Sequence, residues 1–148
     1  MANEKKVITF PKGLPGFEEE KSFILSEEEG IPLAQLDSER NKEIGFVLLR
    51  PQLFFSEYLP GVDLTPDEIE LMEIGPDDQV DVWAIMTLCL KDMSLSTVNL
   101  RAPLIINSRT NKGIQIILGD ESFSYRQQIF SGMENHPGAE GAREGAIG

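Results

Sequence analysis

Short apolar segments separated by polar and turn-forming residues occupy most of the chain, a pattern that is typical of β-strands. The pattern predicts strands at residues 7–10, 23–25, 31–36, 44–49, 80–89, 98–100, 104–107 and 115–118. The run at 44–49 is almost continuously apolar and indicates a strand buried on both faces. Residues 80–89 predict a long strand with one face largely in the core and the other mixed.

Proline, glycine and asparagine mark two turns and one interruption of a strand. Pro15 and Gly16 suit the second and third positions of a type II turn, where the third residue needs a positive φ. Pro103 interrupts an apolar region and predicts a bulge or a sheet edge. Residues 111–113 (NKG) predict the turn of a hairpin between two apolar runs.

One segment predicts a helix. Thr65 is a suitable N-cap, a proline follows at the first helical position, and Glu68 stands three residues after the cap. Ile69 and Met72 then supply an apolar stripe, and a Gly-Pro pair at 75–76 ends the helix.

This order of elements predicts a mainly β protein, a compact antiparallel β-barrel-like single domain with one short helix. The length of 148 residues fits one core, and 41% hydrophobic with 26% charged residues is ordinary for a globular protein. We expect the domain to span residues 1–130. The Gly-rich segment 131–148 has little to bury, and we expect it to be a disordered tail.

Charge changes this picture in one respect. The chain has 13 Lys and Arg against 25 Asp and Glu, a net charge of −12, which argues against contacts with nucleic acid or with an anionic membrane. No basic residue lies between Arg50 and Lys91, but nine acidic ones do: Glu57, Asp63, Asp67, Glu68, Glu70, Glu73, Asp77, Asp78 and Asp81. The segment is either a solvated face or a surface that binds a basic protein.

The residues that catalysis or metal binding would need are scarce. Cys89 is the single cysteine, so no intrachain disulfide can form, which suits a reducing cytoplasm. The single histidine, His136, lies in the expected tail, and no phosphate-binding loop or metal-ligand spacing is present. We therefore expect no enzymatic activity, no cofactor and no metal. The alternatives are a carboxylate-dependent hydrolase and a barrel that binds a small ligand or a carbohydrate.

Three segments carry a more specific signal. They are residues 8–18 (ITFPKGLPGFE), residues 98–107 (VNLRAPLIIN) and residues 113–118 (GIQIIL), the last followed by Tyr125, Arg126 and Gln127. In this order and spacing they resemble the bacterial flagellar assembly factor family FliW. The similarity runs from about residue 7 to residue 127 and does not extend over 131–148.

The resemblance implies a cytoplasmic, non-enzymatic β-barrel-like protein with two partners, flagellin and the RNA-binding translational regulator CsrA. Bound to CsrA, such a protein relieves repression of flagellin translation; bound to flagellin, it releases CsrA. It touches no RNA itself, and we expect it to be a monomer when free.

Two sets of residues are candidates for these contacts. The carboxylates of Glu68, Glu70, Glu73, Asp77 and Asp78 are candidates for binding basic CsrA. The aromatic residues are candidates for an exposed apolar contact patch, with burial in the core as the alternative for at least two of them. They are Phe17, Phe54, Phe55 and Tyr58.

Overall fold

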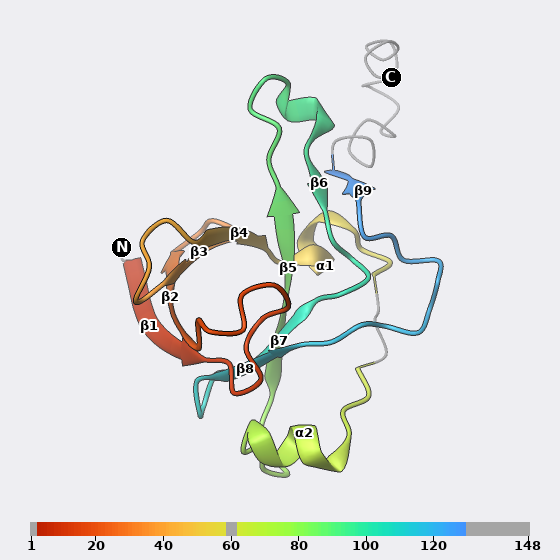
Figure 1. Ribbon diagram of the computed structural model, residues 1–148. Coiled ribbons are helices and arrows are strands. Elements are labelled where there is room, and N and C mark those ends of the chain that lie inside the picture. Colours follow the sequence, from red (N-terminus) through yellow and green to blue (C-terminus); the bar gives the residue numbers. More distant parts are fainter. Residues whose placement is uncertain (1–2, 59–61, 130–148) are drawn as a thin grey trace.

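Nine strands form one sheet in the computed structural model, in which residues 3–58 and 62–129 are described (Figure 1). The strands are β1 Asn3–Thr9, β2 Ser22–Glu28, β3 Leu33–Ser38, β4 Gly45–Leu49, β5 Val80–Thr87, β6 Thr97–Val98, β7 Leu104–Asn107, β8 Lys112–Gln115 and β9 Gln127–Gln128. The predicted mainly β class is confirmed. The predicted tail, residues 131–148, lies outside the described residues.

Seven of the strands close into a barrel. Strands β1 to β4 pair antiparallel with their neighbours in sequence, and β4 pairs with β5. Strand β5 pairs with β7, β7 with β8, and β8 returns to β1 through one parallel pair, Thr9 with Lys112. Strands β6 and β9 extend the sheet from β5 outside the closed ring.

The hydrophobic core has an inner and an outer part, and β5 contributes side chains to both. Trp83 and Ile85 pack into the interior of the barrel with Phe10 and Phe23. The alternate residues of β5, such as Ala84, pack outside the barrel in two further clusters. One face of β5 is therefore mostly core, and the other combines the buried Trp83 with the exposed Thr87, in agreement with the mixed face expected. The strand ends two residues earlier than predicted, at Thr87.

The predicted helix is α2, Pro66–Leu71. The Thr65 hydroxyl accepts a hydrogen bond from the Glu68 amide at 3.1 Å, and the Thr65 amide donates to Glu68 Oε1 at 2.9 Å, so the capping box is present. The predicted apolar stripe is wrong for Ile69, which is 40% exposed, whereas Met72 is fully buried. A second short helix, α1 Pro51–Phe54, was not predicted, because one turn gives no periodicity in the sequence.

The turn predicted at Pro15 and Gly16 has the expected geometry. Gly16 has φ +87°, and the Phe17 amide donates to the Leu14 carbonyl at 2.8 Å. At Pro103, where a bulge or a sheet edge was predicted, the strand is interrupted by a longer connection. Residues 99–103 join β6 to β7 between the pairs Met86 with Val98 and Trp83 with Leu104.

The turn between β7 and β8 lies earlier in the chain than predicted. Asn107 pairs with Lys112, so the turn comprises residues 108–111 and closes at Asn111, with φ +58°. Gly113 belongs to β8 rather than to the turn. It is covered by Phe10: a Cβ atom at this position would lie 2.7 Å from Phe10 Cε2. Glycine is needed at this position because Phe10 packs against it. The local sequence gives no sign of that contact.

Candidate partner-binding surface

Six carboxylates lie on α2 and on the loop that leads to β5. We call this set the acidic surface: Asp67, Glu68, Glu70, Glu73, Asp77 and Asp78. The side chains differ in exposure. Glu70, Glu73 and Asp77 are exposed, as is Asp67, whereas Glu68 and Asp78 are half-buried. The predicted acidic residues are thus brought together, but they divide into solvent-exposed and structural members.

Glu68 is one of the structural members. Its carboxylate completes the capping box, and its Oε2 atom lies 3.7 Å from Lys12 Nζ. Lys12 comes from the segment that follows β1, so this ion pair joins two distant parts of the chain. A substitution at Glu68 would change the start of the helix as well as the surface charge.

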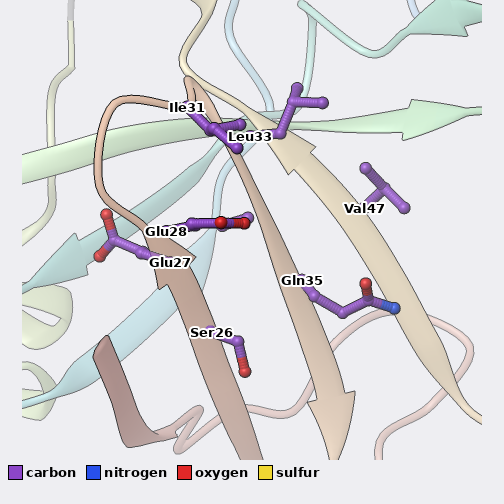
Figure 2. A pocket seen from close by; sticks show the side chains of 8 residues that line it. Ser26, Glu27, Glu28, Ile31, Leu33, Gln35 and Val47 are labelled. Atoms are coloured by element: carbon purple, nitrogen blue, oxygen red, sulfur yellow. The ribbon is translucent and has the colours of Figure 1, made fainter. Parts of the chain in front are cut away.

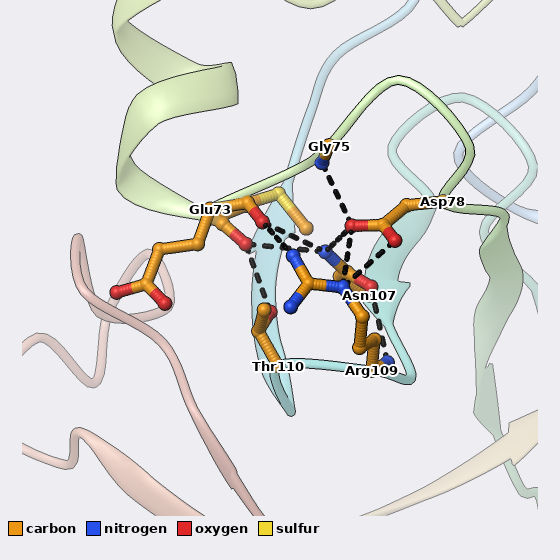
Figure 3. A network of polar contacts seen from close by, with 7 residues as sticks. Glu73, Gly75, Asp78, Asn107, Arg109 and Thr110 are labelled. Carbon is orange, nitrogen blue, oxygen red and sulfur yellow. Dashed lines mark hydrogen bonds and ion pairs between the residues drawn. The ribbon is translucent and has the colours of Figure 1, made fainter.

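Asp78 is the second structural member, held by donors from the β7–β8 hairpin (Figure 3). Its Oδ1 atom accepts a hydrogen bond from Arg109 Nε at 2.8 Å, and its Oδ2 atom accepts from the Gly75 amide at 2.7 Å and from Asn107 Nδ2 at 3.2 Å. The guanidinium of Arg109, followed by the Gly75 amide, holds the pKa of the Asp78 carboxyl well below its ordinary value. Asp78 therefore stays ionised and anchors the loop.

The same hairpin satisfies the carbonyl groups at the C-terminal end of α2. The Met72 carbonyl accepts from Thr110 Oγ1 at 2.8 Å and from Asn107 Nδ2 at 3.3 Å. The Glu73 carbonyl accepts from Arg109 Nη2 at 2.8 Å. These bonds fix α2 on the barrel, since the last carbonyls of a helix have no partner within it.

Sequence reasoning missed Asn107, Arg109 and Thr110 as members of this site. Arg109 lies 31 residues after its partner Asp78. Spacing within the chain gives no sign of such a pair. The available signal was a polar Asn-Ser-Arg-Thr run at 107–110, directly after an apolar strand.

The aromatic candidates do not form one exposed patch. Phe17 is 38% exposed and packs its ring edge against Phe46 of the inner core, with centroids 5.5 Å apart. Phe54, the last residue of α1, and Phe55, which follows it, are half-buried against the outer cluster. Of these three aromatic side chains, Phe17 is thus exposed, whereas Phe54 and Phe55 are only partly exposed.

Tyr58 lies in the core, the alternative given above for at least two of the aromatic candidates, since it is 2% exposed. Its hydroxyl donates to the Leu100 carbonyl at 2.7 Å, and its ring packs edge-on to Phe123 at 4.9 Å. Burial raises the pKa of Tyr58 to about 12. Tyr58 therefore connects the segment after α1 with residues 99–103, which precede β7.

Exposed aliphatic side chains gather instead on the connection between β5 and β6, which contains the 3₁₀ turn η1, Met93–Leu95. Leu90 is 84% exposed, Leu95 56% and Met93 45%. The connection projects beyond the barrel (Figure 1). The interior of the barrel is filled by large side chains, Trp83, Phe10 and Phe23 among them.

Two further observations concern the described part of the chain. None of its helices has the length and apolar character needed to cross a membrane. Within the same residues, no group of three or more histidine, cysteine, aspartate or glutamate side chains is placed to hold a metal ion.

The fold and this surface define a small β-barrel protein with an acidic exterior region built on a short helix. The model of the FliW protein family matches residues 1–129. The flagellar assembly factor FliW of Syntrophomonas wolfei is 35% identical over 145 residues, covering 96% of this chain and 91% of the relative. That of Bacillus licheniformis is 39% identical over 127 residues, covering 85% and 87%.

A solved structure agrees with the sequence matches. The crystal structure of the flagellar assembly factor FliW superimposes with a TM-score of 0.73 at 32% identity, covering 84% of this chain and 85% of that one. The chain belongs to the FliW family and is a flagellar assembly factor. The Syntrophomonas alignment, at 96% of the chain, also reaches into the segment after residue 130.

Proposed function

We propose that this flagellar assembly factor acts in the cytoplasm, without enzymatic activity, by exchanging two protein partners. Bound to CsrA, it relieves repression of flagellin translation. Bound to accumulating flagellin, it releases CsrA, which represses again. The exchange depends on the relative concentrations and affinities of the partners. In this proposal the free protein is a monomer and makes no contact with RNA.

The observation that carries the proposal is the acidic surface, in a chain of the FliW family. Glu70, Glu73 and Asp77 present exposed carboxylates, and the nearest base of the network, Arg109, is engaged by Asp78. An RNA-binding regulator needs lysine and arginine for its phosphate contacts. The acidic surface complements such a partner and accelerates its association, whereas it repels RNA.

The test is a triple charge reversal, Glu70→Lys with Glu73→Lys and Asp77→Lys. These three exposed positions leave the capping box and the Asp78 network intact. We expect affinity for purified CsrA, measured by titration calorimetry, to fall about tenfold or more at low salt, which corresponds to about 1.4 kcal/mol. The difference from wild type is expected to shrink at high salt because exposed charges are screened.

A matched control separates local from overall charge. Glu39→Lys with Glu43→Lys and Glu121→Lys makes the same change in net charge at exposed positions outside the acidic surface. This control is expected to retain most of the wild-type affinity. Equal losses in both triple variants would show that only net charge matters and would remove the acidic surface from the proposal.

The aromatic candidates are tested separately, with flagellin as the ligand. Phe17→Ala is expected to weaken flagellin binding while the unfolding temperature changes little, because the ring is partly exposed. Phe55→Ala is expected to lower the unfolding temperature, because its ring packs in the outer cluster. Wild-type flagellin binding by a folded Phe17→Ala variant would exclude Phe17 from that contact.

A further inference from the structure

The outer face of β1 and β2 takes no part in the outer core as far as residues 3–58 and 62–129 show. Neither of the two outer clusters formed by these residues contains a member of β1 or β2. Leu25 and Leu36 point into the barrel, so their neighbours in sequence, such as Ile24, Ser26 and Gln35, point outward. Ser26 pairs with Gln35 and Gln35 with Val47, which places these three side chains side by side on the outer face.

This face is hollowed into an open groove near the β2–β3 turn (Figure 2). The groove has a volume of about 300 Å³ and is lined by Ser26, Glu27, Glu28, Ile31, Leu33, Ala34, Gln35 and Val47. A second hollow of about 420 Å³ shares Glu27, Glu28 and Ile31 with the first and also includes Glu4 and Arg50. Glu27, Glu28 and Ile31 therefore border both hollows.

The groove combines an aliphatic floor with an acidic rim. Ile31 is 47% exposed, and Leu33 and Val47 are half-buried beside it. The rim carries the carboxylates of Glu27 and Glu28, and Glu4 belongs to the second hollow.

Among the described residues that line the two hollows, Arg50 of the second is the one base, and its charge is already engaged. Its Nη2 atom lies 3.3 Å from Glu27 Oε1, its Nη1 atom lies 3.8 Å from Asp81 Oδ1, and its guanidinium carbon lies 4.1 Å from the centroid of the Trp83 ring. The remaining charge of the groove is negative.

We propose that this groove docks a segment of a partner protein in which lysine or arginine alternates with aliphatic residues. The aliphatic side chains would cover Ile31, Leu33 and Val47, and the basic side chains would lie against Glu28. Charge complementarity selects this occupant over an acidic or a wholly apolar one. The groove is distinct from the acidic surface and extends the proposed function to a second contact.

The register of β1 places the two surfaces at opposite ends of the barrel. Asn3, at the start of β1, pairs with Glu28 at the groove. Thr9, at its end, pairs with Lys112, which follows the turn that holds α2. A partner segment in the groove therefore need not displace a partner on α2.

The test is a nuclear magnetic resonance titration of the full chain with two synthetic nine-residue peptides. One alternates lysine with isoleucine or valine, and the other has glutamate in place of every lysine. We expect the lysine peptide to shift the amide resonances of residues 26–35 and 47, and the glutamate peptide to shift none of them. No binding, equal binding of both peptides, or shifts confined to residues 65–78 would overturn the proposal.

A pair of matched variants then tests the residues. Glu28→Lys with Ile31→Ser is expected to reduce affinity for the lysine peptide about tenfold, the equivalent of about 1.4 kcal/mol. Glu121→Lys with Ile117→Ser makes the same charge change and removes an exposed apolar side chain outside both the groove and the acidic surface. This control is expected to retain wild-type affinity, and an equal loss in both would refute the groove.

These experiments test the groove and the acidic surface separately. The effect of the triple reversal on CsrA binding tests the proposed function and not the groove. Glu28→Gln, which removes one charge and keeps the side-chain shape, checks the groove if the double variant does not fold, and wild-type affinity for the lysine peptide would count against it.

Discussion

Asp78 accepts hydrogen bonds from Gly75, Asn107 and Arg109, and these donors lower the pKa of its carboxyl in the folded chain. In the unfolded chain an aspartate has a pKa of about 3.9, so near that pH the unfolded state binds more protons. The stabilisation is therefore complete above the unfolded pKa and is lost as the pH falls toward the lower folded value.

Replacement of this carboxyl should alter stability on the acid side. Asp78→Asn is expected to be less stable than wild type at neutral pH, and its stability should fall less steeply between pH 5 and pH 2. Urea unfolding at a series of pH values measures both effects. Asp77→Asn, an exposed neighbour, is the control and should keep the wild-type slope; parallel slopes for all three proteins would contradict the role given to Asp78.

Gly113 gives a second prediction for a single residue. A methyl group there would lie 2.7 Å from the Phe10 ring, so Gly113→Ala must displace a fully buried aromatic side chain. We expect a loss of about 1 to 3 kcal/mol in the free energy of unfolding, the usual cost of overpacking. Gly119→Ala is the matched control, because no atom lies within 4 Å of its Cβ position. Thermal or urea unfolding distinguishes the two.

Among the elements, α2 depends on contacts from outside itself. The helix has six residues, and helices shorter than about 12 residues are marginal in water without packing. Its N-terminal end is capped by its own residues, but its C-terminal carbonyls are satisfied by the β7–β8 hairpin. The orientation of the acidic surface is therefore set by a hairpin more than 30 residues away.

Arg109→Ala should loosen α2 without unfolding the barrel. We expect hydrogen exchange of the amides at residues 69–74 to accelerate about tenfold or more, while β1 to β4 keep their protection. Arg126→Ala removes the same charge at an exposed position and should leave exchange in α2 unchanged. Faster exchange across the whole barrel in Arg109→Ala would instead show that the network stabilises the fold globally.

The sequence predicts those elements whose signals are local. The capping box of α2 and the type II turn at Gly16 are set by residues within four positions of each other, and both are present. The β7–β8 turn was predicted two residues too late, because glycine at position 113 is required by the packing of Phe10, which is distant in sequence. The structural roles of Asn107, Arg109 and Thr110 also depend on tertiary contacts and could not be predicted.

For the whole molecule, the position of β5 between the inner and outer cores predicts cooperative unfolding. Trp83 is the single tryptophan and reports on the inner core, while Ala84, the next residue, packs in the outer one. We expect urea transitions followed by tryptophan fluorescence and by far-ultraviolet circular dichroism to coincide. Separate midpoints would show that the outer core melts independently.

The charge of the whole chain indicated the kind of partner, but not where on the surface that partner binds. The net charge of −12 and the family resemblance both point to a protein partner, and family membership is established by the comparisons. The division of the acidic residues into exposed and structural members required the contacts of Glu68 and Asp78. The groove on β2–β4 was not predicted either, since it depends on the register of three strands.

The single pair between Thr9 and Lys112 has a consequence for the order in which the barrel is made. Strands β1 to β4 pair only with their neighbours along the chain or with strands synthesised later, so this meander can assemble while the ribosome is still translating the rest. The ring closes only when residue 112 has emerged, 103 residues after Thr9. Until then the free edge of β1 is an unpaired strand, and we expect the nascent chain to be most prone to aggregation in that interval.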